Sequence, residues 1–204
     1  NDIPTYSGGL GILAGDSMRS SADLNIPLVA VSLVSRGGYF RQEIDAEGRQ
    51  IEHPDSWDPN SWAKPLHAKI SIAIEGRPVW IRGWLYILEG HNSKLPIILL
   101  DTNLEENQVD DQEITGYLYG GDLTYRLKQE IVLGIGGVRM LHALGFRIRH
   151  YHMNEGHSAF LGLELLRRHS HPVSNLTTEQ IHYDIPQVRR LCDFTTHTPI
   201  EAGH

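Results

Sequence analysis

The alternation of strand-like and helix-like segments is the feature that most constrains the fold of this 204-residue chain. In the C-terminal part, residues 146–153 have the pattern of a strand, residues 155–169 that of a helix, and residues 192–198 that of another strand. Strands that alternate with helices form βαβ units on a parallel sheet. The sequence therefore predicts an α/β protein whose sheet is mostly parallel.

The N-terminal part adds further strands and an antiparallel hairpin. Residues 27–34 and 95–100 are apolar runs of strand length, as expected for strands that are buried on both faces. Residues 67–75 and 79–88 alternate apolar and polar side chains around a turn at residues 76–78. This pattern predicts a hairpin that extends the parallel sheet.

Two segments have no clear periodicity and are expected to form loops. The first, residues 45–66, follows a turn at residues 37–42 and contains three prolines. The second, residues 102–121, is polar and acidic. Long loops in compact domains are often functional, and no linker in the chain marks a boundary between two domains.

The longest helical pattern, residues 123–144, contains glycines at Gly134, Gly136 and Gly137. A glycine in a helix interior costs about 1 kcal/mol relative to alanine. Close approach of another backbone or of a ligand is the simplest compensation. Asn154 is expected to cap the helix of residues 155–169, and residues 177–180 (TTEQ) form a capping box for a further helix.

A glycine-rich stretch lies near the start of the chain, with Gly8, Gly9 and Gly11 ahead of a helical pattern in residues 12–24. Glycines let the backbone lie close to a ligand, and the first N–H groups of a helix attract anions. The expected ligand is an anion, most often a phosphate, and the alternative is a tight turn and glycine-rich helix start that bind no ligand. No Gly-Lys-Ser/Thr follows, so a P-loop is excluded. The spacing fits a dinucleotide fingerprint, but residues 1–7 make a poor strand before it.

Composition excludes several classes of protein. The chain carries a net charge of −7 and no basic stripe, which argues against a nucleic-acid partner. No apolar run reaches the ~18 residues that a membrane span needs. The single cysteine, Cys192, fits a reducing compartment and hence the cytoplasm. The first and last residues do not look like domain termini, so we expect an internal piece of a longer polypeptide.

Polar clusters follow two of the predicted strands, where α/β proteins bind ligands. Residues 152–157 (HMNEGH) and 195–199 (TTHTP) are these clusters. His197, flanked by threonines, either exchanges hydrogen bonds with substrate hydroxyls or is a satisfied core histidine. Asn154 favours the capping role, and Glu155 and His157 would not share a helix face. The twelve histidines lack an HExxH pattern or a third ligand, so no metal site is predicted.

Five stretches, in order along the chain, resemble the amino-terminal half of an α-glucan (glycogen, starch or maltodextrin) phosphorylase. They are residues 7–17 (SGGLGILAGDS), 38–42 (GYFRQ), 118–130 (LYGGDLTYRLKQE), 152–157 (HMNEGH) and 194–199 (FTTHTP). The Asn-Glu-Gly-His run at residues 154–157 and the Pro-x-x-Ala-Gly-His run at residues 199–204 are similar to the shorter bacterial and archaeal branch of that family. Residues 43–117 contribute little to the resemblance.

The resemblance implies that residues 1–204 are part of the Rossmann-like N-terminal domain of a GT-B glycosyltransferase. Its reaction is the reversible phosphorolysis of terminal α-1,4-glucosidic bonds, so the partners are an α-1,4-glucan, inorganic phosphate and glucose 1-phosphate. The cofactor is pyridoxal 5′-phosphate, whose phosphate relays a proton and whose lysine lies in a C-terminal domain outside this chain. The piece alone is expected to be inactive, and the full-length protein is a candidate homo-oligomer.

The resemblance also assigns roles to single residues. The backbone of Gly8, Gly9 and Leu10 faces the substrate phosphate, with Gly9 also near the cofactor phosphate. His197 is the catalytic residue that contacts the glucosyl unit. The remaining candidate substrate contacts are Asn154, Glu155 and His157 near the glucan channel and Glu113 on the acidic loop.

Three other functions stay open from the residues alone. The first is a GT-B glycosyltransferase that uses a nucleotide sugar. The second is a non-catalytic carbohydrate-binding module that uses Trp57 and Trp62, although tryptophans in irregular segments are more often packing anchors. The third and least favoured is a dinucleotide-dependent oxidoreductase.

Overall fold

The computed structural model describes residues 3, 8–91, 93–118, 120–172 and 181–197. The chain divides into two compact units, residues 1–129 and 130–204. Each unit is described by itself. The capping box expected at residues 177–180 lies outside the described residues, as does nearly all of the segment that precedes Gly8.

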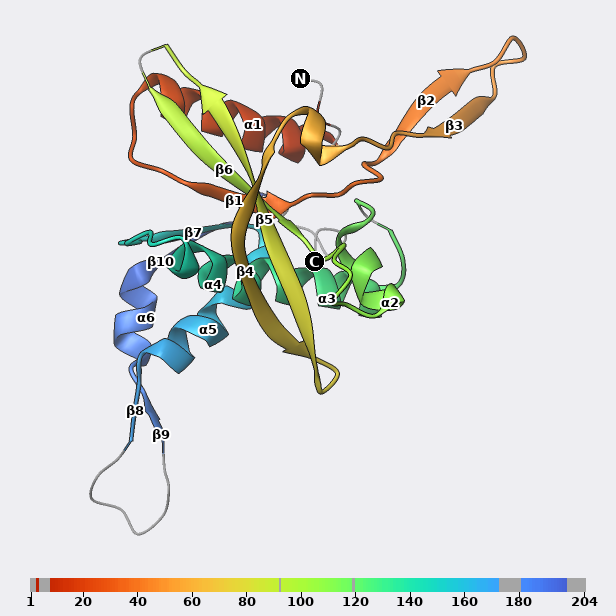
Figure 1. The fold of residues 1–204 in the computed structure, drawn as a ribbon. Coiled ribbons are helices and arrows are strands. Elements are labelled where there is room, and N and C mark those ends of the chain that lie inside the picture. The colour runs from red at the N-terminus through yellow and green to blue at the C-terminus, as the bar shows by residue number, and fades with distance from the viewer. Residues whose placement is uncertain (1–2, 4–7, 92, 119, 173–180, 198–204) are drawn as a thin grey trace. The chain divides into compact units, whose positions relative to one another are not determined.

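The first unit is built on a four-stranded sheet with the strand order β1-β6-β5-β4 (Figure 1). Its elements are α1 (Gly8–Asp23), β1 (Ala30–Leu33), β2 (Phe40–Ile44), β3 (Gln50–Pro54), η1 (Pro59–Ser61), β4 (Lys64–Ile74), β5 (Arg77–Glu89), β6 (Lys94–Asp101), α2 (Val109–Gln112), η2 (Glu113–Thr115) and α3 (Leu123–Ile131). The pair β1–β6 is parallel, whereas β6–β5 and β5–β4 are antiparallel. The sheet is therefore mixed, and a mostly parallel sheet is not confirmed.

The hairpin of β4 and β5 confirms the prediction made from alternation. Ile72 and Ile74 on β4 and Val79 and Ile81 on β5 are buried, while residues between them are more exposed. Ile74 pairs with Arg77, so the loop is only two residues long. Both loop residues, Glu75 and Gly76, have positive φ angles, the conformation of the tight turns that suit the twist of a hairpin.

Three expectations for the first unit are wrong in their details. The glycine-rich stretch is the first turn of α1 rather than a turn before it, because α1 begins at Gly8. Residues 40–54 form a second hairpin, β2–β3, which stands apart from the sheet in Figure 1. Most of its described side chains are exposed, so it has no alternation of buried and exposed positions to detect. The segment 102–121 is not all loop, since it contains α2 and η2.

A small core on one side of the sheet fixes the segment before β4. Its buried members are Val34, Ala63, Trp84 and Leu99, and Trp57 packs against them. The Trp57 indole N–H donates to the carbonyl of Ser35 at 3.0 Å. Trp57 is therefore a packing anchor, as favoured from the sequence, whereas Trp62 is exposed.

Asp101 ends β6 and is fully buried. Its carboxylate accepts hydrogen bonds from the Arg36 guanidinium at 2.6 Å and from the Trp84 indole N–H at 2.7 Å. A buried carboxylate needs such charged and polar donors to remain ionised without a large cost. Asp101 thus links the loop after β1 to the middle of β5.

The second unit contains a parallel strand pair with helices in the connection between its strands. Its elements are the π-helical η3 (Val132–Gly136), α4 (Gly137–Ala143), β7 (Tyr151–Asn154), η4 (Gly156–Ser158), α5 (Leu161–Arg168), β8 (Ser170–Pro172), β9 (Ile181–Tyr183), α6 (Ile185–Leu191) and β10 (Cys192–Thr195). Residues of β7 and β10 pair in parallel from Tyr151–Cys192 to Asn154–Thr195. The βαβ prediction for this part of the chain is confirmed.

The glycines in the middle of the longest helical pattern have a packing reason. A Cβ atom on Gly134 would lie 2.7 Å from the backbone nitrogen of Leu161, at the start of α5. The chain is π-helical at this position, and such segments are a known local distortion of α-helices. The predicted close approach of another backbone is confirmed at Gly134.

Among the described residues, no helix combines the length and apolarity that crossing a membrane requires.

Candidate functional site

The predicted candidates of the second unit gather beyond the carboxyl ends of β7 and β10. The register places Asn154 beside Thr195, so the segments that follow these two strands begin side by side. Glu155 follows β7, and Thr196 and His197 follow β10. This edge is where open α/β sheets bind ligands.

Glu155 is buried at the centre of this cluster, with 7% of its surface exposed. Its backbone N–H donates to the carbonyl of Thr195 at 2.9 Å. Its carboxylate accepts the backbone N–H of His197 and, at 3.4 Å, the hydroxyl of Thr196. The Glu155 carboxylate therefore fixes the segment that follows β10. Because the side chain is buried, its role in this structure differs from that of an exposed side chain that contacts a ligand directly.

The backbone of Glu155 explains why a helix does not begin directly after β7. Its φ angle is +61°, a left-handed conformation that is uncommon for residues other than glycine. The short turn η4 follows, and α5 begins only at Leu161. The expected capping role of Asn154 is wrong, because Asn154 is the last residue of β7.

Asn154 instead contacts His197. The Asn154 Oδ1 atom lies 2.7 Å from the His197 Nε2 atom. An amide oxygen only accepts hydrogen bonds, so in this arrangement Nε2 carries the proton and Nδ1 of the neutral ring is an acceptor. Asn154 is exposed and His197 is half-buried. The pair can therefore orient the imidazole toward a hydroxyl group of a ligand.

His157 lies on η4, two residues beyond Glu155, and its side chain is exposed. His152, on β7, lies 3.0 Å from the Thr195 hydroxyl through its Nε2 atom. The structure brings together Asn154, Glu155 and His197, and it adds Thr196, which the sequence had indicated only as a flanking residue. The contact between Glu155 and the backbone of His197 has no sequence signal, because 42 positions separate the two residues.

Three titratable groups near the strand pair, Cys192, His142 and Tyr151, have pKa values shifted toward their uncharged forms. Burial raises the pKa of the Cys192 thiol, and the neighbouring Asp193 raises it further. Burial lowers the pKa of His142 and raises the pKa of Tyr151. A thiol with a raised pKa is a poor nucleophile at neutral pH. Cys192 is therefore not a candidate for nucleophilic catalysis.

The predicted phosphate contacts lie in the first turn of α1 in the first unit. Gly8 has a φ angle of +65°, and a Cβ atom on Gly8 or Gly9 would meet no atom within 4 Å. Leu10 is also exposed, and the first turn carries no acidic side chain. The first N–H groups of a helix have no partner within the helix, and the positive end of the helix dipole favours an anion there.

Glu113, the last predicted contact, begins η2 and has an exposed side chain. Its backbone carbonyl accepts a hydrogen bond from the Tyr125 hydroxyl at 2.8 Å. Tyr125 lies on α3 and was not among the predicted site residues.

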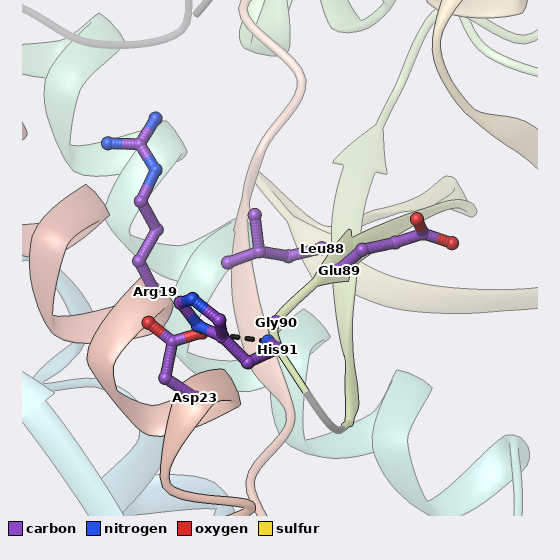
Figure 2. Close-up of a pocket in the computed structure, with 6 residues that line it drawn as sticks. All are labelled: Arg19, Asp23, Leu88, Glu89, Gly90 and His91. Atoms are coloured by element: carbon purple, nitrogen blue, oxygen red, sulfur yellow. Dashed lines mark hydrogen bonds and ion pairs between the residues drawn. The ribbon is translucent and has the colours of Figure 1, made fainter.

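A hollow of about 350 Å³ lies where the end of α1 meets the tip of the β5–β6 hairpin (Figure 2). The residues that line it are Arg19, Asp23, Leu88, Glu89, Gly90 and His91. Figure 2 shows the His91 imidazole turned toward Asp23, where Nδ1 lies 2.7 Å from Oδ1. Hydrogen bonds from His91 lower the pKa of Asp23.

This hollow surrounds a structural contact. A Cβ atom on Gly90 would lie 2.6 Å from the carbonyl carbon of Ala22, so the hairpin tip rests directly on α1. The Ser93 hydroxyl also donates to the Ala22 carbonyl. None of the predicted site residues lines the hollow. The contact between the hairpin tip and Ala22 holds the C-terminal end of α1 against the sheet. Gly8 lies at the other end of this helix.

Within the part of the chain that the structure describes, no three histidine, cysteine or acidic side chains lie together as a metal site would require.

The second unit is thus an α/β unit whose polar side chains gather at two adjacent strand ends, the edge at which α/β proteins generally bind ligands. Comparison with known proteins identifies its family. The chain belongs to the carbohydrate phosphorylase family, whose model matches residues 2–120. The resemblance found in the sequence motifs is thereby confirmed.

Similar proteins extend the match to nearly the whole chain. A maltodextrin phosphorylase of Thermococcus litoralis is 41% identical over 99% of this chain and 24% of its own length. A glycogen phosphorylase of Mycobacterium tuberculosis is 40% identical over 98% of the chain and 24% of its own length. A glycogen phosphorylase of Aquifex aeolicus is 34% identical over 97% of the chain and 28% of its own length. The chain thus spans about a quarter of the length of these curated relatives.

Proposed function

We propose that this chain is part of the N-terminal, Rossmann-like domain of a GT-B α-glucan phosphorylase. In this proposal, the full-length protein catalyses the reversible phosphorolysis of terminal α-1,4-glucosidic bonds in glycogen, starch or maltodextrin to glucose 1-phosphate. The names of the relatives support this reaction. The parallel β7–β10 pair with its helical connection supports the Rossmann-like assignment.

The observation that carries the proposal is the contact between His197 and Asn154 at adjacent strand ends. In the proposed role, the Nδ1 atom of His197 accepts a hydrogen bond from a hydroxyl group of the glucosyl unit. Asn154 holds the ring orientation, and the buried carboxylate of Glu155 holds the backbone of His197. His157 provides a further exposed polar side chain near the glucan. A fixed hydrogen-bonding group lowers the barrier when its bond strengthens in the transition state.

The first turn of α1 is proposed as the wall that faces the phosphates. Pyridoxal phosphate, when bound, supplies a phosphate group that relays a proton to the substrate phosphate. The residues present fit such a group, because Gly8 and Gly9 leave open space and the first turn of α1 carries no acidic side chain. The backbone N–H groups of Gly8, Gly9 and Leu10 then hold and orient the anion. The cofactor lysine is proposed to lie in the part of the protein outside this chain.

The test uses the full-length protein. Incubation with maltodextrin and inorganic phosphate is expected to release glucose 1-phosphate, and the purified protein is expected to absorb as a pyridoxal phosphate protein. The variant His197→Ala should lower turnover by about 10- to 1000-fold. His171→Ala, which removes an exposed histidine on β8, is the matched control and should leave turnover unchanged.

Two results would contradict the proposal. A full-length protein that releases no glucose 1-phosphate and carries no cofactor would exclude the reaction. Unchanged turnover in His197→Ala would remove His197 from the site while leaving the reaction in place.

The alternative functions make different predictions for the same protein. A glycosyltransferase that uses a nucleotide sugar would transfer glucose from that donor without phosphate. A non-catalytic carbohydrate-binding module would bind glucan without turnover, and an oxidoreductase would require a dinucleotide. The phosphorylase names of the relatives favour none of these alternatives.

We also propose a cytoplasmic location, because the single cysteine fits a reducing compartment. The full-length protein is further proposed to be a homo-oligomer.

A further inference from the structure

One face of the β7–β10 pair carries polar side chains from both strands. The two strands run parallel and lie side by side (Figure 1). The register pairs His152 with Asp193 and, two positions further along each strand, Asn154 with Thr195. Because side chains alternate between the two faces of a sheet, these four residues lie on the same face. His197 follows Thr195 by two positions, and its ring contacts Asn154 on this face.

The segment from Thr195 to His197 is tied to the segment that ends β7. The Thr195 carbonyl accepts the backbone N–H of Glu155 at 2.9 Å. The Glu155 carboxylate accepts the backbone N–H of His197 and, at 3.4 Å, the Thr196 hydroxyl. The Asn154 amide oxygen lies 2.7 Å from the His197 ring. These contacts hold the backbone of Thr195 and the two residues that follow it.

His152 supplies the contact to the Thr195 side chain. Its Nε2 atom lies 3.0 Å from the Thr195 hydroxyl, diagonally across the strand pair. Threonine is β-branched, so few χ1 rotamers are open to it, and the allowed rotamer depends on the backbone angles. A hydrogen bond that holds the hydroxyl of Thr195 therefore also restricts the backbone at this residue. The chain leaves β10 toward His197 from that point.

The exposure of the two side chains argues against a role in core packing. His152 is exposed, whereas Thr195 is half-buried. Removal of an exposed imidazole leaves no cavity, so the hydrogen bond to Thr195 is the main contribution that such a variant loses.

We propose that His152 is a positioning residue for His197 and acts through the Thr195 hydroxyl. In this arrangement the His152 imidazole does not touch the substrate. It fixes the direction in which the chain leaves β10, and thereby the place of the His197 ring. This inference rests on the proposed function, because it assumes that His197 contacts the glucosyl unit.

The first experiment compares His152→Ala with His152→Gln in the full-length protein. The alanine variant should lower kcat by about 3- to 10-fold, the effect of one net hydrogen bond, with both KM values nearly unchanged. His152→Gln can still exchange a hydrogen bond with a hydroxyl group and should restore the wild-type kcat. His150→Ala removes a nearby exposed histidine, whose Nδ1 atom is 3.8 Å from Asp193, and should leave kcat unchanged.

The second experiment tests whether the effect passes through Thr195 and His197. Thr195→Val should reproduce the loss seen in His152→Ala, and Thr195→Ser should not. In the His197→Ala background, His152→Ala should cause no further loss of kcat, because the ring that it positions is absent. A purely structural role would lower kcat again by the same factor, and that result overturns the inference.

Two simpler results would also overturn it. One is an unchanged kcat in His152→Ala, and the other is a loss that His152→Gln does not restore. If His197→Ala leaves turnover unchanged, the reaction stands but the inference fails, because His197 then has no role that depends on its position.

Amide hydrogen exchange separates failure of this inference from failure of the proposed function. If the wild-type protein releases no glucose 1-phosphate, the proposed function fails, and exchange in residues 192–197 decides the positioning role. Faster exchange there in His152→Ala than in His152→Gln supports it. Equal exchange in the two variants overturns it.

Discussion

Gly134 is the position where a single added methyl group should do most harm in the second unit. It lies in the π-helical segment η3 and is buried. A Cβ atom there would lie 2.7 Å from the Leu161 nitrogen, 2.8 Å from the Phe160 Cβ and 2.9 Å from the Phe160 carbonyl carbon. Two of these three neighbours are backbone atoms at the start of α5, so a rotamer change cannot relieve the contact.

The expected magnitude follows from two opposing effects. In an open helix position, Gly→Ala gains about 1 kcal/mol of stability from helix propensity. Overpacking a buried site costs about 1–3 kcal/mol, and three contacts below 3 Å at Gly134 place that cost near the upper end. Gly134→Ala should therefore lose about 2 kcal/mol. Gly162→Ala, on α5 with no atom within 4 Å of the new Cβ, should gain about 1 kcal/mol.

The two variants should therefore differ by about 3 kcal/mol, which corresponds to roughly a hundredfold difference in an opening equilibrium. Amide hydrogen exchange in α4 and α5 of the full-length protein is the suitable assay, because it reports local opening in a large protein that does not unfold in one step. Equal protection in Gly134→Ala and Gly162→Ala would refute the reasoning. It would mean that α5 moves away from η3 at little cost.

Two further predictions concern buried carboxylates. Burial alone would raise the pKa of Glu164, but hydrogen bonds from Arg167 and Arg139 outweigh it and lower the pKa from 4.5 to about 2. A lowered folded-state pKa stabilises the protein above pH 4.5, so about 3 kcal/mol should be lost as the pH falls from 4.5 toward 2, measured by exchange in α5. Glu164→Gln should remove that pH dependence, and a pH dependence that persists in the variant would assign it to other groups. Asp101→Asn should destabilise the first unit by about 1–3 kcal/mol, because the Arg36 guanidinium loses its charged acceptor; unchanged amide hydrogen exchange in β5 and β6 would count against this ion pair.

Sequence patterns predicted best where a buried face imposes a regular period. The β4–β5 hairpin and the parallel β7–β10 pair were both predicted, because alternation and strand–helix order come directly from which faces are buried. The β2–β3 hairpin was missed because most of its described side chains are exposed, so no buried face imposes a period on its sequence. The start of α1 was misplaced because glycines carry no helix signal.

For the candidate site, the sequence predicted which residues take part but not the contacts that they make. Asn154, Glu155 and His197 were predicted as polar residues at strand ends, and the family signatures pointed to the same positions. Their individual contacts could not be predicted, and Asn154 was wrongly expected to cap a helix. Glu155 has a positive φ angle, and α5 begins only six residues later, at Leu161. The Glu155 carboxylate accepts the backbone N–H of His197. That conformation is stabilised by contacts between segments about 40 positions apart, which no local pattern records.

The sequence by itself determined the α/β class, the order of most strands and helices, and the family, since these depend on periodicity and on short motifs. Only the tertiary structure decided that Asn154 contacts His197, that Glu155 is buried, and that Tyr125 on α3 donates to the Glu113 carbonyl. The physical reason is the separation along the chain between the residues that each property involves. Periodicity reflects which side of an element is buried, whereas a site depends on distances between side chains and backbones that only the folded chain brings together.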